Sequence, residues 1–190
     1  MKFYASKSNI VIYLYFIYAF AFLTIWGIDA FEQRIDFDFY ADTDTYMEYA
    51  YYDYSISYLI SNFPNLIGPL SILKLLGSNY YLVFALNISI LMYFVYTVKK
   101  YYTLNHFYFV LLMVLSPMIF VSLIGINKEI ISVFVLSLLI RYEFSKNGFY
   151  IFFAFIASFL VRWQLAIFVL AIYFYFNFLV NYSNKKKLIF

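Results

Sequence analysis

Long apolar runs separated by short polar segments dominate the order of residues along this chain. Runs of membrane-spanning length, for which roughly 20 residues are needed, recur throughout the sequence. The predicted spans are residues 9–28, 80–98, 107–124, 130–140, 149–161 and 165–180. The fourth and fifth are short, so we expect residues 125–129 and 162–164 to serve as buried or interfacial turns. The pattern predicts an all-α protein, a polytopic bundle of about six transmembrane helices.

Residues 58–76 are apolar but do not have the pattern of an ordinary span. Pro64, Gly68 and Pro69 fall inside the segment. Proline removes a backbone donor and clashes with the preceding turn of a helix. Irregular backbone at membrane depth is tolerated only against protein or a water-filled cavity. We therefore predict a re-entrant or interfacial helix pair that returns to the side from which it entered.

Composition supports a membrane protein and narrows its chemistry. The chain is 66% hydrophobic and 26% aromatic, and 12% of its residues are charged, against about 25% in soluble proteins. Its mean hydropathy is +0.81. With 190 residues and several spans, we expect one integral membrane domain over residues 1–190. The lack of cysteine excludes disulfides and thiolate chemistry, and the single histidine, His106, argues against a histidine-rich metal centre.

The distribution of basic residues predicts the orientation, because cytoplasmic loops are enriched in lysine and arginine. With the N-terminus in the cytoplasm, nine of the thirteen basic residues fall on the inner side. The four on the outer side are Arg34, Lys74, Lys128 and Arg162. We therefore expect both termini in the cytoplasm and the protein in a bacterial inner membrane, with multiple passes.

Eight of the ten acidic residues lie between Asp29 and Asp53, in a predicted outer loop of residues 29–57. The threading brings three polar islands to the outer side: residues 36–48, 127–129 and 162–164. An ionisable residue at membrane depth costs roughly 2.5–3.5 kcal/mol on insertion scales and usually marks a pathway or site. Lysine and arginine can bind an anionic group such as phosphate, and a nearby carboxylate can accept a proton from a hydroxyl. Together they suit an anionic ligand that also carries hydroxyl groups.

Each island also has a purely structural interpretation, which the sequence leaves open. Thr45 and Glu48 have the spacing of a helix capping box. Lys128 and Glu129 could neutralise one another at a helix start. Arg162 could extend to lipid headgroups beside an interfacial tryptophan. The argument for a site is that all three islands are predicted on the same, outer side of the membrane.

Two motifs resemble a known family. The segment of residues 42–50, DTDTYMEYA, has the pattern D-x-x-x-Y-x-E-x-A in the first outer loop. It resembles the corresponding loop of GT-C glycosyltransferases, membrane enzymes that use polyprenyl-phosphate-linked sugars. Residues 125–129, GINKE, followed by Arg141 and residues 162–164, RWQ, resemble the G-x-N-K-E…R…R-x-Q pattern of EpsG-type and Wzy-type (O-antigen) polysaccharide polymerases. Those proteins usually continue through several more spans.

The resemblance implies a role for each matched residue. Asp42 would be the catalytic base, with Asp44 as the reserve candidate. Lys128, Arg162 and Arg34 would bind the phosphate of the donor. The predicted sugar-binding residues are Tyr46, Asn127, Glu129, Trp163 and Gln164. The pairs Asp36/Asp38 and Asp42/Asp44 offer oxygen ligands for Mg²⁺ or Mn²⁺, although no metal is required and no other cofactor is expected.

The function predicted from the sequence is transfer of sugar from a polyprenyl-(pyro)phosphate donor on the outer side of the membrane, in polysaccharide biosynthesis. The expected partners are a polyprenyl-linked saccharide, membrane lipids and other polysaccharide-assembly proteins, with no nucleic acid. A non-catalytic accessory subunit, or a truncated part of an assembly complex, is the main alternative. A transporter or flippase is the third, but it would carry polar residues deep in several spans, and the predicted spans are nearly uncharged.

Overall fold

The computed structural model describes residues 7–27, 46, 49, 55–62, 64–103, 105–125, 128–159 and 161–180. Over these residues the chain is helical and contains no strand, which confirms the all-α prediction. The helices are α1 (Lys7–Phe22), α4 (Ile56–Asn62), α5 (Ile67–Leu75), α6 (Tyr80–Tyr101), α7 (His106–Val114), α8 (Pro117–Ile124), α9 (Lys128–Ser145), α10 (Gly148–Phe159) and α11 (Trp163–Phe174). Two π-helical turns, η1 (Leu23–Gly27) and η4 (Tyr175–Val180), extend α1 and α11. A 3₁₀ turn, η3 (Pro64–Leu66), joins α4 to α5.

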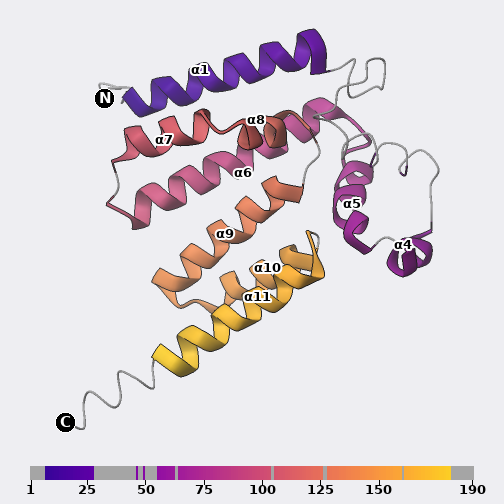
Figure 1. The fold of residues 1–190 in the computed structure, drawn as a ribbon, viewed down its shortest axis with the longest axis vertical. Coiled ribbons are helices and arrows are strands. Elements are labelled where there is room, and N and C mark those ends of the chain that lie inside the picture. The colour runs from indigo at the N-terminus through magenta and orange to yellow at the C-terminus, as the bar shows by residue number, and fades with distance from the viewer. Residues whose placement is uncertain are drawn as a thin grey trace.

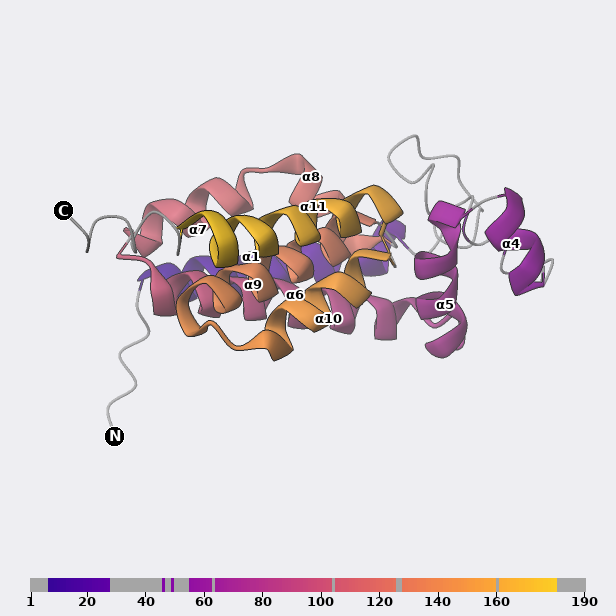
Figure 2. The ribbon, with the colours of Figure 1, turned by 90° about the horizontal axis from the view of Figure 1, so that it is seen from below.

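Most of the helices lie lengthwise in a bundle and alternate in direction along the chain (Figure 1). The start of α6, the end of α8, the start of α9 and the start of α11 lie at one end, here called the site end. The start of α1, the α6–α7 turn, the α9–α10 turn and the end of η4 lie at the other, here called the basic end. Helices α4 and α5 project beyond the site end of the bundle (Figure 2), where Leu70 and Leu73 of α5 pack with Val83 of α6.

One described helix is long and apolar enough to cross a membrane, the 22-residue α6. Helices α7 and α8 pass the same test together, as a pair bent by 68°. The apolar stretches Asn9–Ile25, Gly148–Phe159 and Gln164–Phe174 are shorter. The expected helical architecture is therefore supported, whereas the full set of six membrane spans is a proposal.

The predicted continuous helix over residues 107–124 is broken in the structure. Helix α7 ends at Val114, and α8 begins with Pro117 at its first position after the extended residue Ser116. Proline suits the first turn of a helix, where its missing N–H is not needed, but it cannot continue an existing helix. Pro117 therefore explains the break, although the sequence interpretation did not include it.

The predicted short span over residues 130–140 is also longer in the structure. Helix α9 begins at Lys128 and ends at Ser145, so Lys128 and Glu129 form its first turn. An acidic residue in the first turn is favoured by the positive end of the helix dipole. Residues 128–129, expected in a turn, are thus fixed on a helix end.

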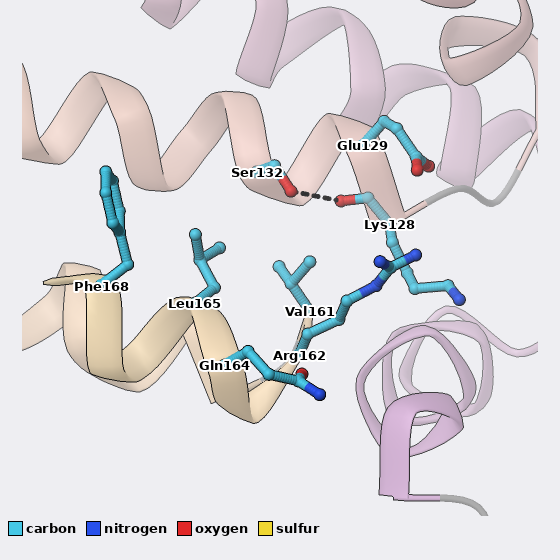
Figure 3. Close-up of a pocket in the computed structure, with 8 residues that line it drawn as sticks. All are labelled: Lys128, Glu129, Ser132, Val161, Arg162, Gln164, Leu165 and Phe168. Atoms are coloured by element: carbon cyan, nitrogen blue, oxygen red, sulfur yellow. Dashed lines mark hydrogen bonds between the residues drawn. The ribbon is translucent and has the colours of Figure 1, made fainter.

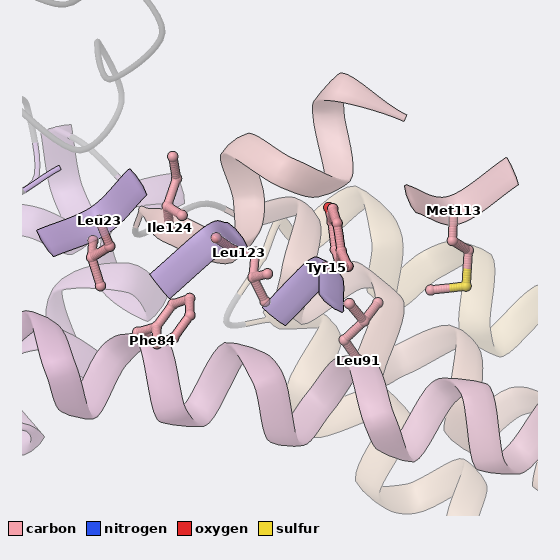
Figure 4. Packing of buried hydrophobic residues seen from close by; sticks show 8 residues of the cluster. Tyr15, Leu23, Phe84, Leu91, Met113, Leu123 and Ile124 are labelled. Atoms are coloured by element: carbon pink, nitrogen blue, oxygen red, sulfur yellow. The ribbon is translucent and has the colours of Figure 1, made fainter. Parts of the chain in front are cut away.

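The described residues form four apolar clusters, and the two largest lie within the bundle. Figure 4 shows the first, in which Tyr15 and Leu23 of α1 and η1 pack with Phe84 and Leu91 of α6 and with Leu123 of α8. The second joins α9, α10 and α11. On α10 it contains buried Ile151 together with the small residues Ala154 and Ala157, and small side chains let helix backbones approach closely.

Segment 58–76, predicted to be a re-entrant or interfacial pair, forms the end of α4, η3 and α5. The 3₁₀ turn begins at Pro64, and Pro69 lies in the first turn of α5, where proline is tolerated. Gly77 and Ser78 follow with positive φ values of 62° and 54° and turn the chain into α6. The segment leads into α6 at the site end of the bundle (Figure 1).

Candidate functional site at one end of the bundle

A pocket of about 370 Å³ lies between the start of α9 and the start of α11. Figure 3 shows its lining side chains. They are Lys128, Glu129, Ser132, Val161, Arg162, Gln164, Leu165 and Phe168. Ligand pockets in proteins have volumes of roughly 300–1,000 Å³. This pocket therefore has room for a small ligand or for the headgroup of a larger one.

The first turn of α9 supplies the polar wall of the pocket. Lys128 and Glu129 are both partly buried, and Ser132 donates a hydrogen bond to the Lys128 carbonyl oxygen over 3.2 Å. The Lys128 ammonium lies 5.9 Å from the centroid of the Tyr46 ring. Tyr46 is only 1% exposed. One residue of the acidic loop is thus buried next to the pocket.

The turn before α11 supplies the second cation. Arg162 is the N-cap residue of α11 in an extended conformation, with φ −159° and ψ 136°, and its side chain makes no capping hydrogen bond. Its backbone N–H donates to the Ser158 carbonyl oxygen over 2.9 Å, which fixes the turn. The side chain is exposed, and none of the carboxylates that the structure describes lies within ion-pair distance of it.

Lys128 and Arg162 extend from their separate helices toward the same side of the pocket (Figure 3). Two cations lining one pocket repel each other unless anions offset them, and the described lining residues supply one carboxylate, that of Glu129. The arrangement therefore favours a bound anion. Arginine is also suited to planar, bidentate recognition of phosphate or carboxylate.

A buried amide positions the chain just before α9. Asn87, on α6, is 2% exposed. Its side-chain N–H groups donate to the carbonyl oxygens of Leu123 and Gly125 over 3.0 and 2.9 Å. The carbonyl groups at a helix C-terminus have no partner inside the helix, so Asn87 satisfies the end of α8 and holds the segment that leads to Lys128.

The structure brings together four of the predicted site residues, Lys128, Glu129, Arg162 and Gln164, in one pocket. Tyr46 is connected to them through Lys128. Trp163 begins α11, but its side chain is outside the described part of the chain. The predicted residues Arg34, Asp42, Asp44 and Asn127, together with the capping pair Thr45 and Glu48, lie outside the described residues.

Four lining residues were not predicted: Ser132, Val161, Leu165 and Phe168. Helical spacing could have revealed two of them. Ser132 follows Lys128 by four positions and Phe168 follows Gln164 by four, so each pair lies on one helix face. Phe168 is 57% exposed and makes the α11 side of the pocket apolar away from Gln164.

Among the described residues no group of three histidine, cysteine or acidic side chains could hold a metal ion. The aspartate pairs suggested for Mg²⁺ or Mn²⁺ are outside those residues. The polar groups that line the pocket are two cations, a carboxylate, an amide and a hydroxyl.

Comparison with protein-family models, curated proteins and solved structures finds no match to this chain. The case for a function consequently depends on the residues and their geometry.

Proposed function

We propose that the chain is a GT-C-like membrane glycosyltransferase or polysaccharide polymerase, which transfers sugar from a polyprenyl-(pyro)phosphate donor on the outer side of the membrane. The observation that carries this proposal is the pocket that Lys128 and Arg162 line together with Gln164 and Glu129. In the proposed orientation the site end of the bundle faces outward.

The surface of the bundle supports a membrane location. Large apolar side chains are exposed on several helices, including Ile17 on α1, Leu112 on α7, Phe152 on α10 and Phe168 on α11, each more than half exposed. Single exposed apolar residues are ordinary on soluble proteins, but large apolar side chains exposed on this many helices suit a surface that lipid covers. A six-span bundle would bury this surface in lipid, with α1, the α7–α8 pair and the shorter helices accommodated by tilt or bilayer thinning.

The pocket combines the two properties that a lipid-linked phosphate requires. Its polar part, Lys128, Arg162 and Gln164, lies where helices end, and its apolar part, Leu165 and Phe168, continues along α11. A phosphate would bind beside the cations while the polyprenyl chain follows the exposed apolar side of α11. A free sugar or soluble anion would gain nothing from this second part.

The proposed reaction uses the pocket as the leaving-group site. A hydroxyl oxygen of the acceptor saccharide forms a bond to the anomeric carbon of the donor, and the bond from that carbon to the phosphate oxygen breaks. The acceptor proton passes to Asp42, with Asp44 as the reserve base. Lys128 and Arg162 offset the charge that remains on the departing phosphate, an effect worth several kcal/mol where water is excluded. Tyr46, next to Lys128, ties the acidic loop to this end of the bundle.

The test is a glycan profile of cells whose surface polysaccharide depends on this chain. Asp42→Asn preserves size and removes the base, and a general base typically contributes about 10²–10⁴-fold. We expect Asp42→Asn and Lys128→Gln to reduce polymer strongly at unchanged membrane abundance, while Asp36→Asn, six positions earlier in the acidic loop, has little effect. Full activity in both Asp42→Asn and Asp44→Asn would reject catalysis by this loop and support the accessory-subunit alternative.

A further inference from the structure

A second pocket with polar side chains lies at the basic end, opposite the candidate site. Its volume is about 140 Å³, and helices α1, α6 and α7 form it. The lining residues are Asn9, Ile12, Val95, Lys99, His106, Phe109 and Val110. None of the residues described above as the candidate site contributes to it.

The polar side chains of this pocket are suited to an anion. Lys99 and His106 come from the end of α6 and the start of α7. No acidic side chain is among its described lining residues, and neither Lys99 nor His106 has a hydrogen-bonding or ionic partner among the side chains that the structure describes. The positive end of the α7 dipole adds to the same field.

The remaining lining residues make the pocket amphipathic. Ile12, Val95, Phe109 and Val110 are apolar. Ile12, Val95 and Val110 also line a neighbouring apolar cavity of only about 10 Å³, which is too small for an acyl chain. The apolar part of a ligand would therefore lie outside the bundle, where Tyr13 and Ile17 of α1 and Leu112 of α7 are exposed.

The length of α6 places this pocket at the level of lipid headgroups. Its 22 residues extend about 33 Å at 1.5 Å per residue, close to the hydrocarbon thickness of about 30 Å. Lys99 is in the last turn of α6. When α6 crosses a bilayer, the pocket reaches the polar interface on the side that carries the basic end.

We propose that this pocket binds the phosphate group of an anionic phospholipid of the cytoplasmic leaflet, with Lys99 and His106 as donors to the phosphate oxygens. The acyl chains lie in the bilayer along α1 and α7. Basic pockets between transmembrane helices on the cytoplasmic side recognise anionic headgroups in this way. The inference requires that the chain lie in a membrane with its basic end on the cytoplasmic side, and it is independent of glycosyl transfer.

The test measures lipid binding to the full chain, purified in a zwitterionic or neutral detergent, by native mass spectrometry. Phosphatidylglycerol is titrated against phosphatidylcholine, with inorganic phosphate as a competitor. Lys100 provides a matched control, because it is the exposed neighbour of Lys99, lies 5.2 Å from the Tyr101 ring and does not line the pocket.

We expect phosphatidylglycerol to bind more tightly than phosphatidylcholine. Lys99→Gln should weaken phosphatidylglycerol binding about fivefold, the factor equivalent to about 1 kcal/mol per lysine at an anionic surface. Lys100→Gln should leave the affinity unchanged, and Lys99→Arg should retain it, which also shows that position 99 tolerates substitution. Millimolar inorganic phosphate should not displace the lipid.

Three results would overturn the proposal. Equal weakening by Lys99→Gln and Lys100→Gln would indicate general attraction to the basic end. Equal affinity for the two lipids would show that the pocket does not select an anionic headgroup. Displacement by inorganic phosphate would assign the pocket to a soluble anion. This experiment measures lipid binding, whereas the test of the proposed function measures polymer in a glycan profile. Each proposal can therefore be rejected without the other.

Discussion

The side-chain amide of Asn87 donates a hydrogen bond to the carbonyl oxygen of Gly125 over 2.9 Å, across 38 positions of sequence. Asn87 lies on a face of α6 that is otherwise packed with Phe84 and Leu91, and Gly125, the C-cap residue of α8, is the first residue of the GINKE motif. A polar side chain inside an apolar helix is costly unless it is satisfied. This bond therefore connects α6 to the segment that leads into the candidate site.

The Asn87 bonds predict a measurable contribution to stability. In Asn87→Leu, of similar size, the carbonyls of Leu123 and Gly125 would be buried without their donor, at a cost of about 1–3 kcal/mol. Thermal or urea unfolding in detergent measures the change. The matched control is Ser89→Ala on the same helix, because the Ser89 hydroxyl bonds only to the Ala85 carbonyl one turn earlier. Equal stability of the two variants would show that Asn87 is not a support of the α8–α9 junction.

The periodicity of apolar runs predicted the helical class and the approximate position of each long helix, because burial in lipid or protein demands continuous apolar sequence. It did not predict where helices break. The 68° bend between α7 and α8 follows from Pro117, a local effect within a run that remains apolar throughout. The span predicted over residues 130–140 was shorter than helix α9. Arg141 ends the apolar run of the sequence, whereas the helix continues to Ser145.

Part of the candidate site could be predicted from the sequence, because charged residues are rare in this chain and therefore stand out. Lys128, Glu129 and Arg162 were recognisable because ionisable residues flanking apolar runs are exceptional. Leu165 and Phe168 look like any other apolar residue of a span, so only the fold assigns them to the pocket. Asn87 gave a usable signal, a lone amide in an apolar run, but its partners are carbonyl groups that a sequence pattern does not reveal.

Arg141 predicts a second measurable contribution to stability. Its guanidinium lies 4.4 Å from the ring centroid of Tyr93, 5.7 Å from that of Tyr96 and 5.8 Å from that of Tyr150. Its Nε donates to the hydroxyl of buried Thr97 over 3.3 Å. The contacts join α9 to α6 and α10, so Arg141→Ala should destabilise the bundle by about 1–3 kcal/mol, with each cation–π contact worth roughly 0.5–2 kcal/mol.

The control for this prediction is Lys100→Ala. That ammonium lies over one ring at an exposed position, where a cation–π contact is worth about 0.5–1 kcal/mol. Chemical unfolding of both variants in the same detergent gives the comparison. If Arg141→Ala loses no more stability than Lys100→Ala, the interaction of α9 with α6 depends on apolar packing alone.

The proposed orientation predicts the accessibility of single cysteines, and the chain contains none of its own to interfere. Introduced in place of Ser78 or Gln164, at the site end, a cysteine should react with an impermeant reagent from outside the cell. In place of Lys100 or Lys146, at the basic end, it should react only after the membrane is opened. Ser78 tests the segment 58–76 most directly, since reaction only from the cytoplasm would make that segment a true span and invert every later loop.

Arg162 predicts how the candidate site holds its ligand. Removing a preorganised charged or hydrogen-bonding group from a reaction site typically costs about 10²–10³-fold in rate. Arg162→Ala should therefore reduce polymer formation by about 100-fold at unchanged membrane abundance. Arg162→Lys separates two roles, because lysine keeps the charge and loses the planar, bidentate fork. A loss well below that of alanine would indicate charge alone, and an equal loss would indicate bidentate contact with phosphate.

Lys74→Ala is the control, a cation on α5 at the same end that does not line the pocket. If Arg162→Ala forms polymer as well as Lys74→Ala does, the pocket between α9 and α11 is not the donor site, whatever Asp42→Asn shows.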